Sequence, residues 1–395
     1  MEYQNQATKK ANKLHKLLIT VILHSKALAM VLFIALPFVG FYLGYKYNEA
    51  LNTSLIPQQL VKVKNSKLNP NSQVNNLSTD AIFHYVDPDQ ASIKDSNPEE
   101  YTIITTGDVI PARSVNSKLV QLNDFNYPFE KTVNFLKSAD AVFINLESPL
   151  IPNCKPTLEG MVFCGDQRDV KGLVYADVTI ASIANNHAGN YGIEGINSTT
   201  NLLKQNHIMV TGNGSQSAIL TIKGKKFGFL GYNDIGNKEA GIAWADILQT
   251  QQDINNLKKQ VDFVIATFHW GTEYTSTPSA TQIQLAHAAI DAGADLIIGN
   301  HPHWVQGIEE YKGKFITYAH GNYVFDQMWS QETREGVLGK YTFNNKGVIN
   351  VEFVPVIIDN YSQPRFASET EANIILARMK DSTQQIKTLK AANKD

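Results

Sequence analysis

The stretches that decide the fold are VDFVIATFHWG at residues 261–271 and DLIIGNHPH at residues 295–303. In each, a short run of apolar and β-branched residues ends in histidine, and such a run is typical of a strand buried on both faces of a sheet. Three earlier runs also end in residues that can bind metals: YTIITT at Gly107-Asp108, AVFIN at Asn145-Leu146-Glu147, and VTIASIA at Asn185-Asn186-His187. The sequence therefore predicts strands whose polar ends meet at one sheet edge.

Side chains at the ends of neighbouring strands converge, so these motifs are expected to gather carboxylates, amides and imidazoles in one place. That donor set suits one or two divalent metal ions of the Mn, Zn or Fe type. The sharpest signal is His301-Pro302-His303, because proline restrains its own backbone angle and the residue before it.

Each motif also has an ordinary explanation when it is taken alone. Gly-Asp is a common turn pair, an isolated Glu147 is usually solvated, a lone His269 is usually structural, and Asn186 can cap a helix. Five such coincidences at strand ends are harder to explain than one shared site.

Helix-like stretches follow two of the strands, at residues 193–205 and 280–292. This alternation indicates a layered α/β architecture with ligands at the carboxyl ends of strands. After His301 the pattern changes to shorter strands, FITYAHGN and VINVEFVPVII, joined by a polar linker at 328–347. A two-sheet α/β sandwich accommodates this change better than a barrel does.

The last part of the chain, residues 367–395, is a polar tail in which we expect a surface helix. Its apolar residues are spaced as one helical face: Ile375, Met379, Ile386 and Leu389.

Composition excludes some functions before any site is considered. The chain has 395 residues, of which 43% are hydrophobic, so it can bury a large core. Its formal net charge of −2 gives no positive field that would favour nucleic acid. We expect any anionic ligand to be held by a local patch.

The N-terminal region predicts a membrane anchor. Residues 1–26 are a basic tail with five lysines, and residues 27–45 carry no charge and are long enough to cross a hydrocarbon core of about 30 Å. Lysines before the span predict a single-pass protein of the cell membrane with a cytoplasmic N-terminus and an extracytoplasmic main domain. A cleavable signal peptide is the alternative. Residues 46–99 form a polar spacer, and the domain proper is expected at 100–366.

Two cysteines, Cys154 and Cys164, flank a loop with Pro156 and Gly160. If this domain lies outside the cytoplasm, a short-range disulfide is the simplest interpretation, and free buried thiols are the alternative.

Taken in order, the motifs GD, NLE, ANNH, HWGTEY, GNHPHWVQ and GNYVFDQ resemble the CapA family of capsule synthesis proteins associated with poly-γ-glutamate. The resemblance covers about two thirds of the chain, residues 100–366. It implies a fold similar to that of calcineurin-like metallophosphoesterases.

The resemblance also implies roles for individual residues. Asp108 and His303 would hold one metal, Asn186, His269 and His301 a second, and Glu147 would bridge them. His187 would donate a proton or orient the scissile oxyanion. Independently, Arg113 is a candidate clamp for a carboxylate or phosphate, because its planar fork pairs with both.

Two positions depart from the pattern of related sequences. The metallophosphoesterase D-x-H motif is Asp108-Val109-Ile110 here, so one histidine ligand is missing. Asn190 stands where the family commonly has an aspartate, which removes a carboxylate partner for a histidine.

The leading hypothesis is a membrane-anchored, metal-dependent hydrolase or transferase that acts on an anionic surface polymer such as poly-γ-glutamate. A metallophosphoesterase on phosphate-bearing lipids or glycans is one alternative, and a non-enzymatic export or tethering factor is another. The resemblance also implies membrane-bound synthetase and export subunits as partners.

Overall fold

The structure, a computed structural model, describes residues 82–93 and 97–392 of the chain. The predicted basic tail, the membrane span at 27–45 and most of the spacer lie outside these residues. Within the part that the structure describes, no helix combines the length and apolar character needed to cross a bilayer.

The first sheet carries three of the five strand-end motifs. Its strands follow the order β16-β15-β14-β1-β2-β5-β6, with β13 paired to β1 as well. Strands β1, β2, β5 and β6 are parallel to one another, and β14 to β16 are antiparallel additions. The bounds are β1 (Tyr101–Val109), β2 (Ala141–Leu146), β5 (Ile180–Ser182), β6 (Met209–Thr211), β13 (Asn322–Val324), β14 (Glu335–Asn344), β15 (Gly347–Asp359) and β16 (Gln363–Phe366).

The second sheet carries the histidine motifs, in the order β11-β12-β10-β9-β8-β7. Its four inner strands are parallel and its two edge strands antiparallel. The bounds are β7 (Ala218–Ile222), β8 (Lys225–Asn233), β9 (Phe263–His269), β10 (Leu296–Asn300), β11 (Ile308–Tyr311) and β12 (Lys314–Thr317). A separate pair joins β3 (Leu150–Ile151) to β4 (Gly165–Asp166).

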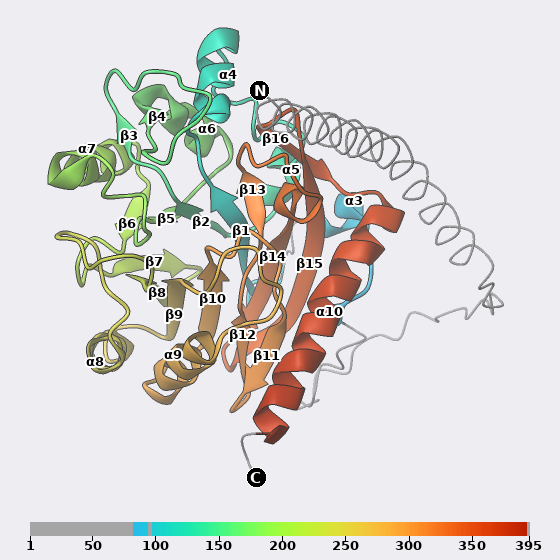
Figure 1. The fold of residues 1–395 in the computed structure, drawn as a ribbon. Coiled ribbons are helices and arrows are strands. Elements are labelled where there is room, and N and C mark those ends of the chain that lie inside the picture. The colour runs from blue at the N-terminus through green and yellow to red at the C-terminus, as the bar shows by residue number, and fades with distance from the viewer. Residues whose placement is uncertain (1–81, 94–96, 393–395) are drawn as a thin grey trace, which may run out of the picture. The chain divides into compact units, whose positions relative to one another are not determined.

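The two sheets pack face to face through an aromatic core. Phe143 of β2 stacks on Phe229 of β8 with ring centroids 6.0 Å apart, and Phe227 contacts Tyr101, Phe263 and Phe343. These rings are buried, and burying such a side chain contributes about 1.5–3 kcal/mol. Helices cover both outer faces (Figure 1). The predicted layered α/β architecture is therefore confirmed as a mixed α/β fold.

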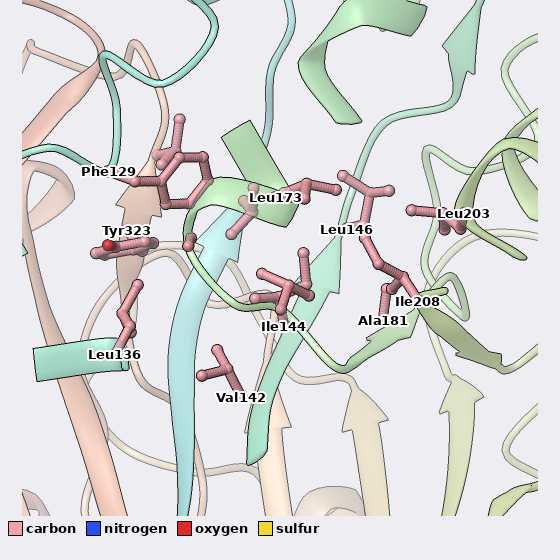
Figure 2. Packing of buried hydrophobic residues seen from close by; sticks show 14 of the residues in the cluster. Phe129, Leu136, Val142, Ile144, Leu146, Leu173, Ala181, Leu203, Ile208 and Tyr323 are labelled. Atoms are coloured by element: carbon pink, nitrogen blue, oxygen red, sulfur yellow. The ribbon is translucent and has the colours of Figure 1, made fainter. Parts of the chain in front are cut away.

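Four short helices and α7 lie on the first-sheet side, and α8 and α9 pack outside the second sheet. Figure 2 shows part of the first-sheet packing, in which Val142, Ile144 and Leu146 of β2 belong to one cluster with Leu173 and Leu203 of the helices. The bounds are α3 (Pro88–Ala91), α4 (Ser114–Leu122), α5 (Val133–Leu136), α6 (Val170–Tyr175), α7 (Gly192–Gln205), α8 (Ile247–Lys258) and α9 (Ala280–Asp291); the 3-10 turns are η1 (Gln167–Asp169) and η2 (Glu332–Arg334).

The last helix, α10 (Glu369–Ala392), contacts β15 of the first sheet and β11 of the second. Ile375, Met379 and Ile386 are buried, as the spacing of the apolar residues predicted. This helix closes one side of the sandwich, where it is visible in red in Figure 1.

Two boundaries differ from the expectation. The predicted linker at 328–347 contains β14, whose Val337, Leu338, Tyr341 and Phe343 are buried. Because glycines and Lys340 interrupt its apolar residues, the sequence pattern did not indicate this central strand, which pairs with both β1 and β15.

The end of the predicted spacer also packs on the domain. Ile82 and Ala91 are buried, and Phe83 stacks against Phe353. The ammonium of Lys340 donates a hydrogen bond to the Ala91 carbonyl at 2.8 Å.

Candidate metal centre

The five motifs meet because their strands are neighbours in register. Asp108 of β1 lies opposite Asn145 of β2, and Asn145 lies opposite Ser182 of β5, just before the Asn185-Asn186-His187 loop. In the second sheet, His269 of β9 lies opposite Asn300 of β10, the residue before His301. Parallel strands thus deliver all five polar ends to one end of the sandwich, as predicted.

The backbone around these residues is close-packed and strained. A Cβ at Gly107 would lie 2.4 Å from the Gly321 carbonyl oxygen, which also accepts the Asp108 N–H at 3.0 Å. His301 and His303 have φ angles of 97° and 58°, a region that non-glycine residues rarely occupy. Backbone strain of this kind persists where the surrounding structure imposes it, often at functional sites.

The ligating side chains form three overlapping clusters, in each of which the donor atoms lie within 4.8 Å of one another. Their members are Asp108, Glu147 and His303; Glu147, His269 and His301; and Glu273, His301 and His303. His269 Nε2 is 3.3 Å from Glu147 Oε1, 3.1 Å from His301 Nδ1 and 2.7 Å from Asn186 Oδ1. All six metal ligands proposed from the sequence are therefore brought together.

The charge state of the cluster suits a cation. Both oxygens of the buried Glu147 lack a hydrogen-bond partner among the described residues, and burial raises the pKa of its carboxyl well above the usual value. Burial also lowers the pKa of His269 to about 3 and that of His301 well below its usual value, so both rings are neutral and offer lone pairs.

One proton is held where the carboxylates converge. His303 is buried, which disfavours its charge, but Glu147 and then Asp108 outweigh this and raise the pKa of His303 to about 9. Asp108 Oδ2 is 3.3 Å from His303 Nδ1, and the hydrogen bond from His303 keeps the pKa of Asp108 low despite burial. The two acids thus attract positive charge, which a divalent ion would also provide.

A frame of amides orients these ligands. Asn145 Nδ2 donates to Asp108 Oδ1 at 2.8 Å, and Asn185 Nδ2 donates to Asn145 Oδ1 at 3.2 Å. Asn322 Oδ1 lies 2.9 Å from His303 Nδ1. Partners of this kind fix ligand orientation and affect metal affinity.

His187 is buried and lies at the cavity side of the cluster. Asn190 Oδ1 accepts the Phe163 N–H at 2.7 Å and lies 3.0 Å from His187 Nδ1. An amide oxygen only accepts, so the network assigns the proton to Nδ1 and leaves the Nε2 lone pair available. Burial lowers the pKa of His187 to about 4, which keeps the ring neutral. Asn190 thus keeps a hydrogen bond to the ring without a carboxylate.

Arg113 lines the cavity, but its guanidinium already has partners. It forms an ion pair with Asp326, whose other oxygen accepts the Ser114 N–H at 3.0 Å, and it donates to the Gly160 carbonyl at 3.3 Å. Its Cζ also lies 4.9 Å and 5.0 Å from the ring centres of Phe163 and Phe325. This arrangement braces the cavity wall and differs from a free anion clamp.

A cavity of about 350 Å³ opens beside the cluster. Its lining includes His187 and His303 together with Glu273, a residue of the HWGTEY motif that the pattern of strand ends does not single out. Glu273 follows the strand end by four residues, so the position of β9 alone could not place it. The other lining residues are Arg113, Ser114, Leu158, Glu159, Met161, Phe163, Tyr274, Phe325, Asp326, Gln327, Trp329 and Tyr361.

The outer wall of the cavity is a loop closed by a disulfide. Cys154 and Cys164 are bonded, as predicted, with Cα atoms 5.9 Å apart. We call residues 154–164 the disulfide loop. Leu158 and Met161 on it are 74% and 63% exposed, while Phe163 stacks on His187 with ring centroids 3.9 Å apart.

Comparison with known proteins agrees with the motifs. Residues 102–327, more than half of the chain, match the family described as bacterial capsule synthesis protein PGA_cap. The capsule biosynthesis protein CapA of Bacillus anthracis is 29% identical over 75% of this chain and 76% of its own length. The PGA biosynthesis protein CapA of Bacillus subtilis is 31% identical over 64% and 70%, respectively.

Among solved structures, a phosphatase from Mycoplasma pneumoniae overlaps 66% of this chain and 94% of its own at 15% identity, with a TM-score of 0.44. That score is too low to carry an argument. The family match, in contrast, spans all five strand-end motifs and confirms the resemblance to CapA proteins. The chain belongs to the bacterial capsule synthesis protein family PGA_cap.

Proposed function

We propose that this protein is a metal-dependent hydrolase that cleaves amide linkages in an anionic surface polymer of the poly-γ-glutamate type. The names of the Bacillus relatives support the substrate class. The observation that carries the chemistry is Glu147, a fully buried carboxylate with no hydrogen-bond partner among the described residues, facing neutral imidazoles. Burial disfavours the charged form of this carboxyl and raises its pKa, and a metal ion would offset the cost of that charge.

The residues fit one or two divalent ions. Asp108, Glu147 and His303 would hold one, and Glu147, His269 and His301 with Asn186 would hold the other. When bound, such ions polarise a scissile carbonyl and acidify water. The mixed carboxylate and imidazole donors favour Mn, Zn or Fe.

His187 would move the proton in this reaction. Its bare Nε2 accepts a proton from the attacking water and returns it to the departing amine, while Asn190 holds the ring through Nδ1. Amide hydrolysis needs this return, because an amine leaves poorly without a proton. The resemblance assigned a donor or an orienting role to His187, and the hydrogen-bond network favours acceptance before donation.

The cavity suits a chain that is both apolar and charged. A γ-linked glutamyl unit has two methylene groups in its backbone, which can pack on Leu158, Met161 and Trp329. Its one free carboxylate would be drawn towards the bound ions. Arg113 would contribute by holding the cavity wall in place.

Metal analysis and two assays test this function together. We expect the purified wild-type protein to hold stoichiometric metal and to shorten poly-γ-glutamate, as followed by size-exclusion chromatography, with no turnover of a generic phosphodiester. Turnover of the phosphodiester alone would identify a phosphoesterase. Bound metal with neither substrate cleaved would identify an export or tethering factor, and absence of metal after reconstitution would refute the centre.

We also propose that residues 27–45 anchor the protein in the cell membrane, with the described domain outside the cytoplasm and next to synthetase or export subunits. The lysines before the span and the disulfide in the domain support this orientation. Protease added to intact protoplasts should digest the domain. Protection of the domain would contradict the proposed topology.

A further inference from the structure

We infer that Glu273 is a metal ligand, supplied by the loop after β9, that completes the centre on its cavity side. This inference rests on the metal centre proposed above and adds a residue to it.

The position of Glu273 relative to two histidines is the primary observation. A carboxylate oxygen of Glu273 and ring nitrogens of His301 and His303 lie within 4.8 Å of one another. Glu273 is half-buried and lines the cavity, whereas the other carboxylates of the centre, Asp108 and Glu147, are fully buried behind it. It therefore reaches these histidines on the side of the cavity that His303 also lines.

Strand β1 leaves room for such a ligand. Asp108 is the only residue of β1 in the three clusters, and Ile110, two positions further on, is fully buried in an apolar cluster with Phe163 and Phe325. The side of the centre near His303 therefore has two carboxylates and one imidazole unless the loop contributes. Glu273 raises the number of available donors there.

The loop is built to hold this carboxylate in place. Gly271 and Tyr274 have φ angles of 90° and 60°, which turn the chain sharply on both sides of Glu273. The Tyr274 N–H donates to the Pro302 carbonyl at 2.8 Å, so the loop is bonded to the turn that carries both histidines. The Tyr274 hydroxyl accepts a hydrogen bond from Gln327 Nε2 at 3.0 Å.

The rest of the loop is fixed from behind. Gln306 Nε2 donates to the Thr275 carbonyl at 3.0 Å, and the Ser382 hydroxyl of α10 donates to the Ser276 carbonyl at 2.5 Å. Ligands held by packing and hydrogen bonds bind metal with less ordering cost.

The chemical consequence is a harder ligand set. With Glu273 the centre has three carboxylates and three imidazoles, and oxygen donors favour Mn²⁺ relative to an all-imidazole site. Removing this carboxylate should therefore weaken Mn²⁺ binding at one of the two positions.

Titration calorimetry with Mn²⁺ on the full-length chain in detergent, after removal of bound metal, tests the assignment. We expect two equivalents for the wild type and, in Glu273→Gln, a loss of about 10–100-fold or more in affinity for one of them. Glu159→Gln is the matched control, since it removes an exposed carboxylate from the same cavity that belongs to none of the three clusters. We expect it to bind Mn²⁺ as the wild type does.

Circular dichroism checks that each variant is folded, and Glu273→Ala serves as a second removal of the carboxylate. Wild-type affinity and stoichiometry in a folded Glu273 variant would overturn this inference and leave the proposed centre intact. A wild-type protein that binds no Mn²⁺, Zn²⁺ or Fe²⁺ would instead overturn the centre and the proposed function.

Discussion

The two walls of the cavity differ in burial and in the interactions that hold them in place. The ligand wall consists of strand ends: His303 lines the cavity, Asp108, Glu147, His269 and His301 lie behind it, and all five are at most 3% exposed. The opposite wall is the disulfide loop, where Leu158 is 74% exposed. Strand register fixes the first, while one covalent bond and a few hydrogen bonds fix the second. Substitutions in the ligand wall should therefore change the metal content and kcat. Substitutions in the disulfide loop should change the affinity for substrate.

The largest effect is expected for His301→Ala. His301 belongs to two of the three ligand clusters, so its loss should strip metal and abolish turnover. The fold should persist, because the core lies in the strands beneath the site. Elemental analysis with a thermal melt checks this, and retention of full metal content would show that His301 is not a ligand.

His187→Ala should separate rate from metal binding. The ring contacts the loop wall through Phe163 and belongs to none of the ligand clusters. We expect metal content close to that of the wild type and a loss of about 10²–10⁴-fold in kcat, the usual contribution of a proton-transferring group. His187→Gln, which preserves a polar side chain, is the control; wild-type turnover in either variant would remove His187 from the mechanism.

Replacing both Cys154 and Cys164 by serine should affect the loop wall alone. Loss of a short-range disulfide typically costs about 2–4 kcal/mol of stability. We expect KM to rise and metal content to stay constant, because no loop residue belongs to a ligand cluster. A loss of metal in this variant would mean that the two walls are not independent.

Arg113→Lys should give the smallest change. Lysine keeps the charge but lacks the planar fork that reaches both Asp326 and the Gly160 carbonyl. The cost should stay within about 1.5–3 kcal/mol, the range for one hydrogen bond to a charged group. Thermal unfolding and KM measure it, and Ser117→Ala on the neighbouring helix is a surface control. An unchanged KM would show that Arg113 does not help to shape the cavity wall.

The ligand wall could be predicted from the sequence because strand ends in a parallel arrangement share one edge. Asp108, Glu147, Asn186, His269 and His301 each stand one or two residues after an apolar run, so the register of the strands brings them together. The alternation of strand-like and helix-like stretches predicted the layered α/β class, and the spacing of apolar residues predicted the C-terminal helix.

Residues whose positions depend on backbone turns or on distant partners could not be predicted in this way. Glu273 reaches the centre only because Gly271 and Tyr274 adopt positive φ angles. The ion pair of Arg113 could not be predicted, because its partner, Asp326, lies far along the chain. Strand β14 was missed because its apolar residues alternate with Gly and Lys, so that burial on both faces was not evident.

Asn190 couples the disulfide loop to the imidazole of His187. One amide oxygen accepts both the backbone N–H of Phe163 in the disulfide loop and the ring N–H of His187. Because the Phe163 ring also stacks on that imidazole, the orientation of His187 depends on the position of the disulfide loop. A substitution that displaces the loop is therefore expected to release the imidazole from its fixed orientation as well.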